Sequence, residues 1–281
     1  MTDQQQFQEN YLDISSRQRM FYRCCIPDNP KGAVCVVHGY TEHSGRYTDV
    51  LEYFRERGFA VVAPDLLGFG KSAKTLGDMK SFRCSVEAVA SLLMHLQENH
   101  GIGRFFVIGH SLGGCMTLAL AGLYPDLVKG LVTVAAMILI PDYVSPMLRI
   151  VSNILAAMFP KLPVQKIDLA NATRNEAVKA AAKQDQLYYR GKIRARTGVQ
   201  MLKGMELARS MLQNITAPSL VLHGSKDVIM PQKGSELVLK ELACTDKTLK
   251  VFDGWYHELL NEPDKEILFK FILKWINEHN R

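Results

Sequence analysis

Short apolar runs rich in β-branched residues recur along the chain, and each is followed by Gly, Pro or Asp and then by a segment with helical spacing. This alternation is typical of βα units, in which helices join parallel strands and cover the sheet. Strands are predicted at 33–39, 59–65, 104–110, 131–136, 219–224 and 249–254. Helices are predicted near 47–57, 84–100, 112–123, 232–243 and 264–279. The sequence therefore predicts an α/β fold with a mostly parallel central sheet and helices on both faces.

Two regions depart from this alternation. The N-terminal stretches QENYLDIS and RMFYRCCIP are predicted to form an antiparallel hairpin at the sheet edge. Between Ala136 and Ser219 lie about eighty residues, far more than a βα crossover needs. We therefore expect a single domain over 1–281 with an inserted helical cap, or lid, over 137–214.

The first half of this insertion, residues 143–159, has the spacing of an amphipathic helix. Its apolar face holds Met147, Leu148, Val151, Ile154, Leu155 and Met158, and Arg149, Ser152 and Asn153 lie largely opposite. The segment is too short and too polar to span a membrane. Both a lid over a lipid site and an ordinary core-packing helix fit this pattern.

The composition is that of a globular protein rather than a disordered one, with 47% hydrophobic and 22% charged residues in 281. The polar start MTDQQQFQEN lacks the features of a signal peptide, which predicts a cytoplasmic protein. The six cysteines form no C-x-x-C pair, so neither disulfides nor a zinc site are expected. The net charge of +6 comes from spread Lys and Arg, which argues against nucleic acid and allows peripheral contact with anionic membranes.

One serine lies where a strand gives way to a helix. Gly109-His110-Ser111-Leu112-Gly113 fits the pattern G-x-S-x-G between an apolar run and a helical segment. Such a turn is so sharp that glycines are needed beside it, and it raises the serine hydroxyl above the sheet edge. Ser111 is therefore the predicted nucleophile.

A serine hydroxyl needs a base, and the base needs a group that orients it. Asp227 and His257 each follow a predicted strand, so they lie at the same sheet edge as Ser111. The order Ser, Asp, His along the chain is that of α/β-hydrolases. We interpret Asp253 as a strand-end turn residue and His223, at the end of a buried strand, as structural.

Acyl transfer also needs two N–H groups aimed at the developing oxyanion. The N–H of Leu112, directly after the nucleophile, is one predicted donor. The N–H of Tyr40, in the loop after the first parallel strand, is the other. His110 cannot be the base, because adjacent residues on this turn point in different directions, and we expect it to touch substrate instead.

Four stretches resemble the monoacylglycerol lipase family of serine hydrolases. They are HGYTEHSGRY (38–47), DLLGFGKS (65–72), GHSLGG (109–114) and DKTLKVFDGWYHELLNEP (246–263). The similarity runs from about residue 15 to the C-terminus. It implies Ser111, Asp227 and His257 as the triad and Tyr40 and Leu112 as oxyanion donors. It also implies that Glu42, Arg46 and His110 line the polar end, where a glycerol-like group would sit.

The cap departs from this family's pattern. Members commonly carry Asp-Pro-Leu there, with a tyrosine three residues before the Asp, whereas this chain reads AKQDQL at 182–187. Tyr188 or Tyr189 is a candidate substitute for the missing tyrosine. Cysteines that members often place in the cap and after the catalytic Asp are also absent, and Met230 stands in the latter region. These changes concern recognition of the head group rather than hydrolysis.

The sequence thus predicts a serine ester hydrolase that cleaves a monoacylglycerol or similar single-chain lipid ester through an acyl-enzyme. No metal or organic cofactor is called for. A serine at the elbow excludes dehalogenases and epoxide hydrolases, which use Asp there, and the apolar lid argues against a peptidase that would use Glu42 to bind an amine. Lysophospholipase and aryl or hydroxycinnamoyl carboxylesterase activities stay as alternatives, as does a non-catalytic binding protein of this fold. The oligomeric state is left open.

Overall fold

The computed structural model describes residues 6–16, 18–140 and 153–280. Its main sheet has the strand order β1-β2-β4-β3-β5-β6-β9-β10. These strands are β1 (Gln8–Ser15), β2 (Gln18–Cys25), β3 (Ala33–Val37), β4 (Ala60–Pro64), β5 (Phe105–His110), β6 (Val128–Val134), β9 (Ser219–Gly224) and β10 (Lys247–Phe252). At one edge, β1 pairs antiparallel with β2, and β2 pairs antiparallel with β4. From β4 to β10 in this order, all neighbouring strands are parallel. The predicted α/β-hydrolase fold and edge hairpin are confirmed.

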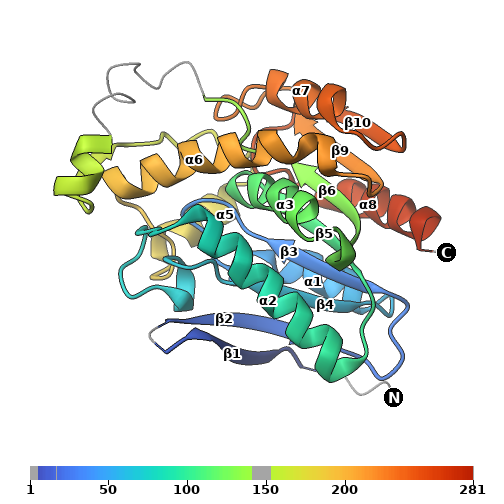
Figure 1. The fold of residues 1–281 in the computed structure, drawn as a ribbon. Helices are drawn as coiled ribbons and strands as arrows, with labels where there is room; N and C mark the ends of the chain where they lie inside the picture. Colours follow the sequence, from blue (N-terminus) through green and yellow to red (C-terminus); the bar gives the residue numbers. More distant parts are fainter. Residues whose placement is uncertain (1–5, 17, 141–152, 281) are drawn as a thin grey trace.

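Helices cover both faces of this sheet (Figure 1). One face carries α1 (Thr48–Arg55) and α8 (Lys265–His279), and the other carries α2 (Phe82–His100), α3 (Leu112–Leu123), α6 (Ala195–Met211) and α7 (Lys233–Glu241). Helix α1 uses an apolar stripe: Val50, Leu51 and Phe54 are buried, which is the spacing of one helical face. The sheet therefore lies between two hydrophobic clusters.

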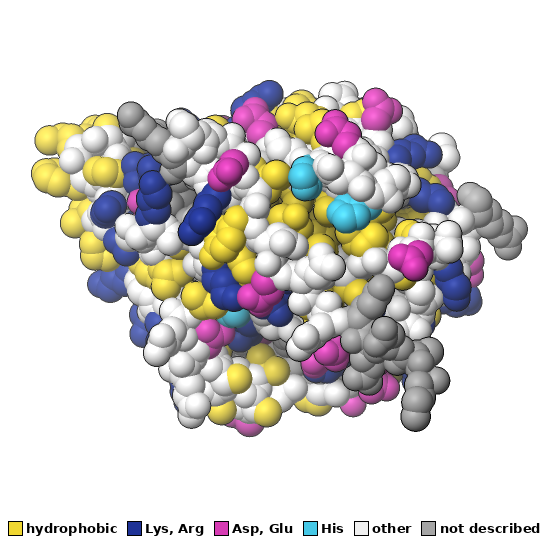
Figure 2. Space-filling view, turned by 90° about the horizontal axis from the view of Figure 1, so that it is seen from below, with side chains coloured by type: hydrophobic (Ala, Val, Ile, Leu, Met, Phe, Trp, Pro, Cys, Tyr) yellow, Lys and Arg dark blue, Asp and Glu magenta, His cyan; other side chains and the backbone are white. Residues whose placement is uncertain are grey.

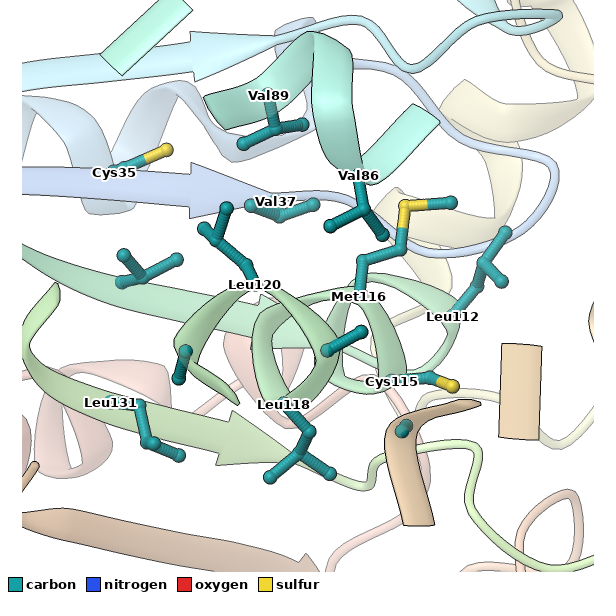
Figure 3. Close-up of a cluster of buried hydrophobic side chains, with 14 of the residues drawn as sticks. Cys35, Val37, Val86, Val89, Leu112, Cys115, Met116, Leu118, Leu120 and Leu131 are labelled. Atoms are coloured by element: carbon teal, nitrogen blue, oxygen red, sulfur yellow. The ribbon is translucent and has the colours of Figure 1, made fainter. Parts of the chain in front are cut away.

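Helix α3, which follows the serine, is buried on all sides. Figure 3 shows Met116 pointing towards Val86 of α2, and Leu120 beside Val37 of β3. Full burial of a Leu or Met side chain contributes roughly 1.5–3 kcal/mol. This packing fixes the start of α3, and hence Ser111, relative to the sheet.

The insertion is only partly separate from this body. It contains α5 (Glu176–Gln184) and a two-stranded pair of β7 (Pro163–Gln165) and β8 (Ile193–Arg194), which are too short and polar to be predicted from periodicity. Helix α6, although within 137–214, buries Met201, Met205 and Ala208 in the same cluster as α2 and α3. The last part of that range therefore belongs to the helical layer over the sheet.

Of the predicted lid face, Met147, Leu148 and Val151 lie outside the described residues. Residues 153–158 are helical, with Ile154 and Met158 61% and 66% exposed. These two side chains are not part of the core.

No disulfide joins any of the six cysteines, all of which lie in the described ranges, and Cys84 alone among them is exposed. Within the described ranges, no helix is long and apolar enough to cross a membrane. Within the same ranges, no cluster of His, Cys, Asp and Glu side chains could hold a metal ion.

Candidate active site

Ser111 occupies a strained turn between β5 and α3. Its φ of 53° and ψ of −114° lie in a region that residues with side chains rarely adopt. A side chain at Gly109 would overlap Thr117, and one at Gly113 would overlap the carbonyl of Val37. The sequence around the serine thus folds this way because only glycine fits at both flanking positions.

Asp227 and His257 meet in the loops after β9 and β10. The His257 Nδ1 lies 2.7 Å from the Asp227 Oδ2. The other oxygen of Asp227 accepts hydrogen bonds from the backbone N–H groups of Ile229 and Met230, at 2.8 and 2.9 Å. The carboxylate is fully buried, so these contacts fix its orientation and that of the imidazole.

The electrostatics keep Asp227 ionised. Burial by itself raises the pKa of this carboxyl, but the charge of His257 and hydrogen bonds from His223, His257 and the Met230 N–H outweigh burial and hold the pKa well below its usual range. Asp227 can therefore orient and stabilise an imidazolium without taking its proton.

His257 lies beside the residue that precedes the serine. Its ring centroid is 4.8 Å from that of His110, and its backbone carbonyl accepts a hydrogen bond from the His110 Nε2 at 3.2 Å. Ser111 and His257 are both nearly buried, at 7% and 4% exposure. The structure thus brings the loops of all three predicted triad residues to one end of the sheet.

His223 contacts the acid as well, a contact that sequence reasoning missed. Its Nε2 lies 3.3 Å from the Asp227 Oδ2, and its Nδ1 lies 2.9 Å from the Ser235 Oγ. The only signal in the sequence was a histidine four residues before the aspartate, which also fits a structural residue. His223 therefore helps to hold Asp227.

The two predicted oxyanion donors have free N–H groups: among the described residues, neither Tyr40 nor Leu112 donates its backbone N–H to an acceptor. Leu112 is the first residue of α3, where N–H groups lack helical partners. Next to Tyr40, Thr41 has a φ of 74°, and its carbonyl accepts the N–H of Tyr189 at 2.8 Å. A contact with the cap thus supports the strained loop.

Glu42 is buried within a hydrogen-bond network. Its Oε2 accepts the Gly39 N–H (2.9 Å) and the Tyr47 hydroxyl (2.7 Å), and lies 3.1 Å from the His110 Nδ1. Its Oε1 accepts the Arg46 Nε at 3.0 Å. With four partners, Glu42 fixes the loop that carries Tyr40.

Arg46 extends this network to the histidine loop. Its guanidinium donates to the Glu258 Oε2 at 2.7 Å and lies 4.9 Å from the centre of the Tyr188 ring. Glu258 directly follows His257. The network therefore joins the oxyanion loop, the serine turn and the histidine loop, and the sequence did not reveal Tyr47, Tyr188 or Glu258 as members.

Charges in the network support one another. Burial raises the pKa of Glu42, but His110 and Arg46 outweigh it and hold the pKa well below the ordinary value. Burial lowers the pKa of His110, but Glu42 outweighs it and raises the pKa. Both ring nitrogens of His110 face acceptors, as an imidazolium requires.

We expect Glu42→Gln to lower the free energy of unfolding by about 3 kcal/mol, because it leaves buried cations without their full countercharge. The ionised Glu42 carboxylate stabilises the fold fully above its unfolded pKa of about 4.3. This stabilisation is lost as pH falls through the pKa that Glu42 has in the fold, which is lower. Protonated His110 stabilises the fold fully below its unfolded pKa of about 6.5. This stabilisation is lost as pH rises through the pKa that His110 has in the fold, which is higher.

The stability difference between wild type and Glu42→Gln should therefore be largest between about pH 4.3 and 6.5. Urea unfolding followed by circular dichroism across pH 3–9 measures it. Glu9→Gln, which removes the charge from two surface ion pairs, with Arg23 and Lys71, is the control and should shift stability little. A difference that stays constant with pH would contradict the role of this buried pair.

A serine on a strained turn, a buried Asp–His pair and two free N–H groups on an eight-stranded α/β sheet define the constellation of a serine hydrolase of the α/β-hydrolase fold. The model of the family "Serine aminopeptidase, S33" matches residues 28–264, and the chain belongs to this family of hydrolases.

Similar proteins extend over nearly the whole chain. A monoacylglycerol lipase from Mycolicibacterium smegmatis is 34% identical over 265 residues, covering 93% of this chain and 94% of the relative. Phospholipase YtpA from Bacillus subtilis is 28% identical, covering 86% and 94%. The crystal structure of monoacylglycerol lipase from Paleococcus ferrophilus matches with a TM-score of 0.83 and 30% identity, covering 92% and 99%. The resemblance to the monoacylglycerol lipase family is confirmed.

Proposed function

We propose that this protein is a carboxylic ester hydrolase that cleaves monoacylglycerols, or a similar single-chain lipid ester, to a fatty acid and an alcohol. The observation that carries the proposal is the pairing of Asp227 with His257 at 2.7 Å beside the strained turn of Ser111. Relatives that include monoacylglycerol lipases support the substrate class.

The residues then act as follows. Ser111 attacks the ester carbonyl while His257 takes its proton, and Asp227 holds the imidazole in the required tautomer. The N–H groups of Tyr40 and Leu112 stabilise the oxyanion. His257 returns the proton to the leaving alcohol, and water repeats the sequence on the acyl-enzyme to release the fatty acid.

Two of the alternatives, an aminopeptidase and a non-catalytic binder, fit the site less well. An aminopeptidase would need a free carboxylate for the substrate amine, yet Glu42 is bound to four protein groups. A non-catalytic binder would have no reason to keep Ser111, Asp227 and His257 together. Lysophospholipase activity is favoured by the similarity to a phospholipase, and an aryl or hydroxycinnamoyl esterase would use the same triad.

The test is fatty acid release from monooleoylglycerol and lysophosphatidylcholine, and acid release from a hydroxycinnamoyl ester, measured side by side with Ser111→Ala as the blank. Preferred turnover of monooleoylglycerol supports the proposal. Preference for either of the other two esters would keep the triad and overturn the substrate.

We extend the proposal to a peripheral contact between the cap and a lipid surface. Ile154, Met158, Phe159 and Leu162 are 61%, 66%, 56% and 41% exposed. Figure 2 shows hydrophobic side chains gathered at the end of the molecule where Figure 1 places this segment, with Lys and Arg beside them. Apolar side chains flanked by cations are suited to anionic membranes.

Replacing Ile154, Met158 and Phe159 together by Ser should weaken binding to anionic phospholipid vesicles at least tenfold. The reason is that burial of each of these side chains in the lipid contributes roughly 1 kcal/mol or more. Hydrolysis of long-chain esters should fall with it, whereas turnover of p-nitrophenyl acetate should not change. Ile267→Ser, an equally exposed site on α8, is the control. Equal losses on both kinds of ester would show that the segment supports the fold instead.

A further inference from the structure

A cavity of about 400 Å³ lies between the cap and the oxyanion loop. Tyr40 and Glu258 line it from the body, and residues of 166–173, 178–183 and 188–191 line it from the cap. Tyr40 carries a predicted oxyanion donor, and Glu258 adjoins His257. Because His257 would protonate the leaving alcohol, we expect the alcohol part of a substrate on the side of the site where Glu258 lines this cavity.

The cap is held over this cavity by direct bonds to the oxyanion loop. The His43 Nε2 lies 2.7 Å from the Asp185 Oδ2, and Tyr189 donates its N–H to the Thr41 carbonyl. Tyr188, a candidate for the missing cap tyrosine, is 8% exposed and lines the same cavity. The cap wall is therefore fixed relative to the leaving-group side.

The charge of the lining is unbalanced. Five cationic side chains line the cavity, namely Arg46, Lys166, Lys179, Lys183 and Arg190, against the two carboxylates of Asp168 and Glu258. Glu42 and Glu258 neutralise Arg46, and Glu176 pairs with Lys179.

Three of the five cations have no such partner. Within the described part of the chain, no carboxylate pairs with Lys166, Lys183 or Arg190. Arg190 instead donates to the carbonyls of Ala182 and Asp185, which anchors its guanidinium at the mouth. The mouth thus presents a surplus of positive charge to whatever enters.

We propose that this cavity binds the anionic head group of a single-chain lipid, a phosphate monoester on the glycerol. This inference rests on the proposed function and names its substrate class. Ammonium and guanidinium groups complement phosphate oxygens, whereas the trimethylammonium group of choline would meet charges of its own sign. Water would cleave the carboxylic ester, releasing the fatty acid and glycerol 3-phosphate with the phosphate ester intact.

The test compares octanoylglycerol with octanoylglycerol 3-phosphate, both kept below their critical micelle concentrations so that a lipid surface plays no part. The variant is Lys166→Gln with Lys183→Gln, since neither side chain has a partner whose loss would harm folding. The control is Lys250→Gln with Lys274→Gln, two exposed lysines remote from the cavity.

We expect wild type to prefer the phosphate substrate. The cavity variant should raise its KM about fivefold to tenfold, as expected for two partly exposed charges, and leave the KM for octanoylglycerol and both kcat values unchanged. Added NaCl should raise the KM for the phosphate substrate and leave the KM for octanoylglycerol unchanged. Equal effects on both substrates, or none, would overturn the inference.

A second readout separates this inference from the proposed function. Glycerol 3-phosphate should inhibit hydrolysis of p-nitrophenyl acetate more strongly than glycerol does, and less so in the cavity variant, even if neither octanoyl ester is cleaved. If neither octanoyl ester is cleaved but glycerol 3-phosphate still inhibits in this way, the result counts against the proposed function and not against this inference. Inhibition by inorganic phosphate as strong as by glycerol 3-phosphate would indicate a free-phosphate site and overturn the head-group assignment.

Discussion

Replacement of Ser111 by Ala should lower kcat/KM for monooleoylglycerol by about 10⁴-fold to 10⁶-fold, as loss of the nucleophile does in serine hydrolases. The variant has no group that can form the acyl-enzyme, so what activity is left comes from the oxyanion donors and binding alone. Oleate release measured by mass spectrometry gives the rate, and thermal unfolding checks that the fold is retained.

Ser210→Ala, on the exposed side of α6, is the matched control and should keep full activity. Substantial turnover by a folded Ser111→Ala protein would show that another residue attacks the ester. The strained backbone at position 111 would then have no catalytic explanation.

Replacement of Asp227 by Asn should lower kcat by about 10⁴-fold, the size of loss seen when the triad acid of another serine hydrolase is changed in this way. The Asn side chain cannot accept from His257 and the two backbone N–H groups while also supplying a countercharge for the imidazolium. The pH dependence of kcat measures the effect, because the loss should be greatest at neutral pH.

His223→Gln is the informative companion to this variant. It removes a ring 3.3 Å from the Asp227 Oδ2 while the 2.7 Å contact between Asp227 and His257 stays available. Its kcat should therefore fall much less than that of Asp227→Asn. Equal losses would mean that His223, rather than Asp227, controls the orientation of His257.

The regular elements of the fold were predictable because their apolar runs are short and end at Gly, Pro or Asp. Helix α3 was predicted at its observed ends, and β5, β9 and α8 within one residue of them. β6 begins at Val128, three residues before its predicted start, because Lys129 and Gly130 interrupt the apolar run. The serine turn was predictable because only glycine fits at positions 109 and 113, and these two glycines are visible in the sequence.

Contacts between polar residues that are distant in the sequence produce no local sequence pattern. Arg46 and Glu258 are separated by 212 positions, and nothing in their local sequences indicates that they pair. The end of the cap also leaves no signal, because the whole interval between two predicted strands was assigned to it. Helix α6 therefore fell within the predicted cap although it packs on α3. His223 was interpreted as structural because its neighbours along the strand are all buried.

The most direct test of the account is to treat the protein with a fluorophosphonate and to locate the adduct by peptide mass spectrometry. An activated serine reacts with this reagent, whereas an ordinary hydroxyl does not. We predict one adduct per chain, on Ser111, formed in parallel with loss of monooleoylglycerol hydrolysis and absent from Asp227→Asn on the same timescale. An unlabelled protein, or one labelled elsewhere that still hydrolyses the ester, would contradict the assignment of Ser111 as the nucleophile.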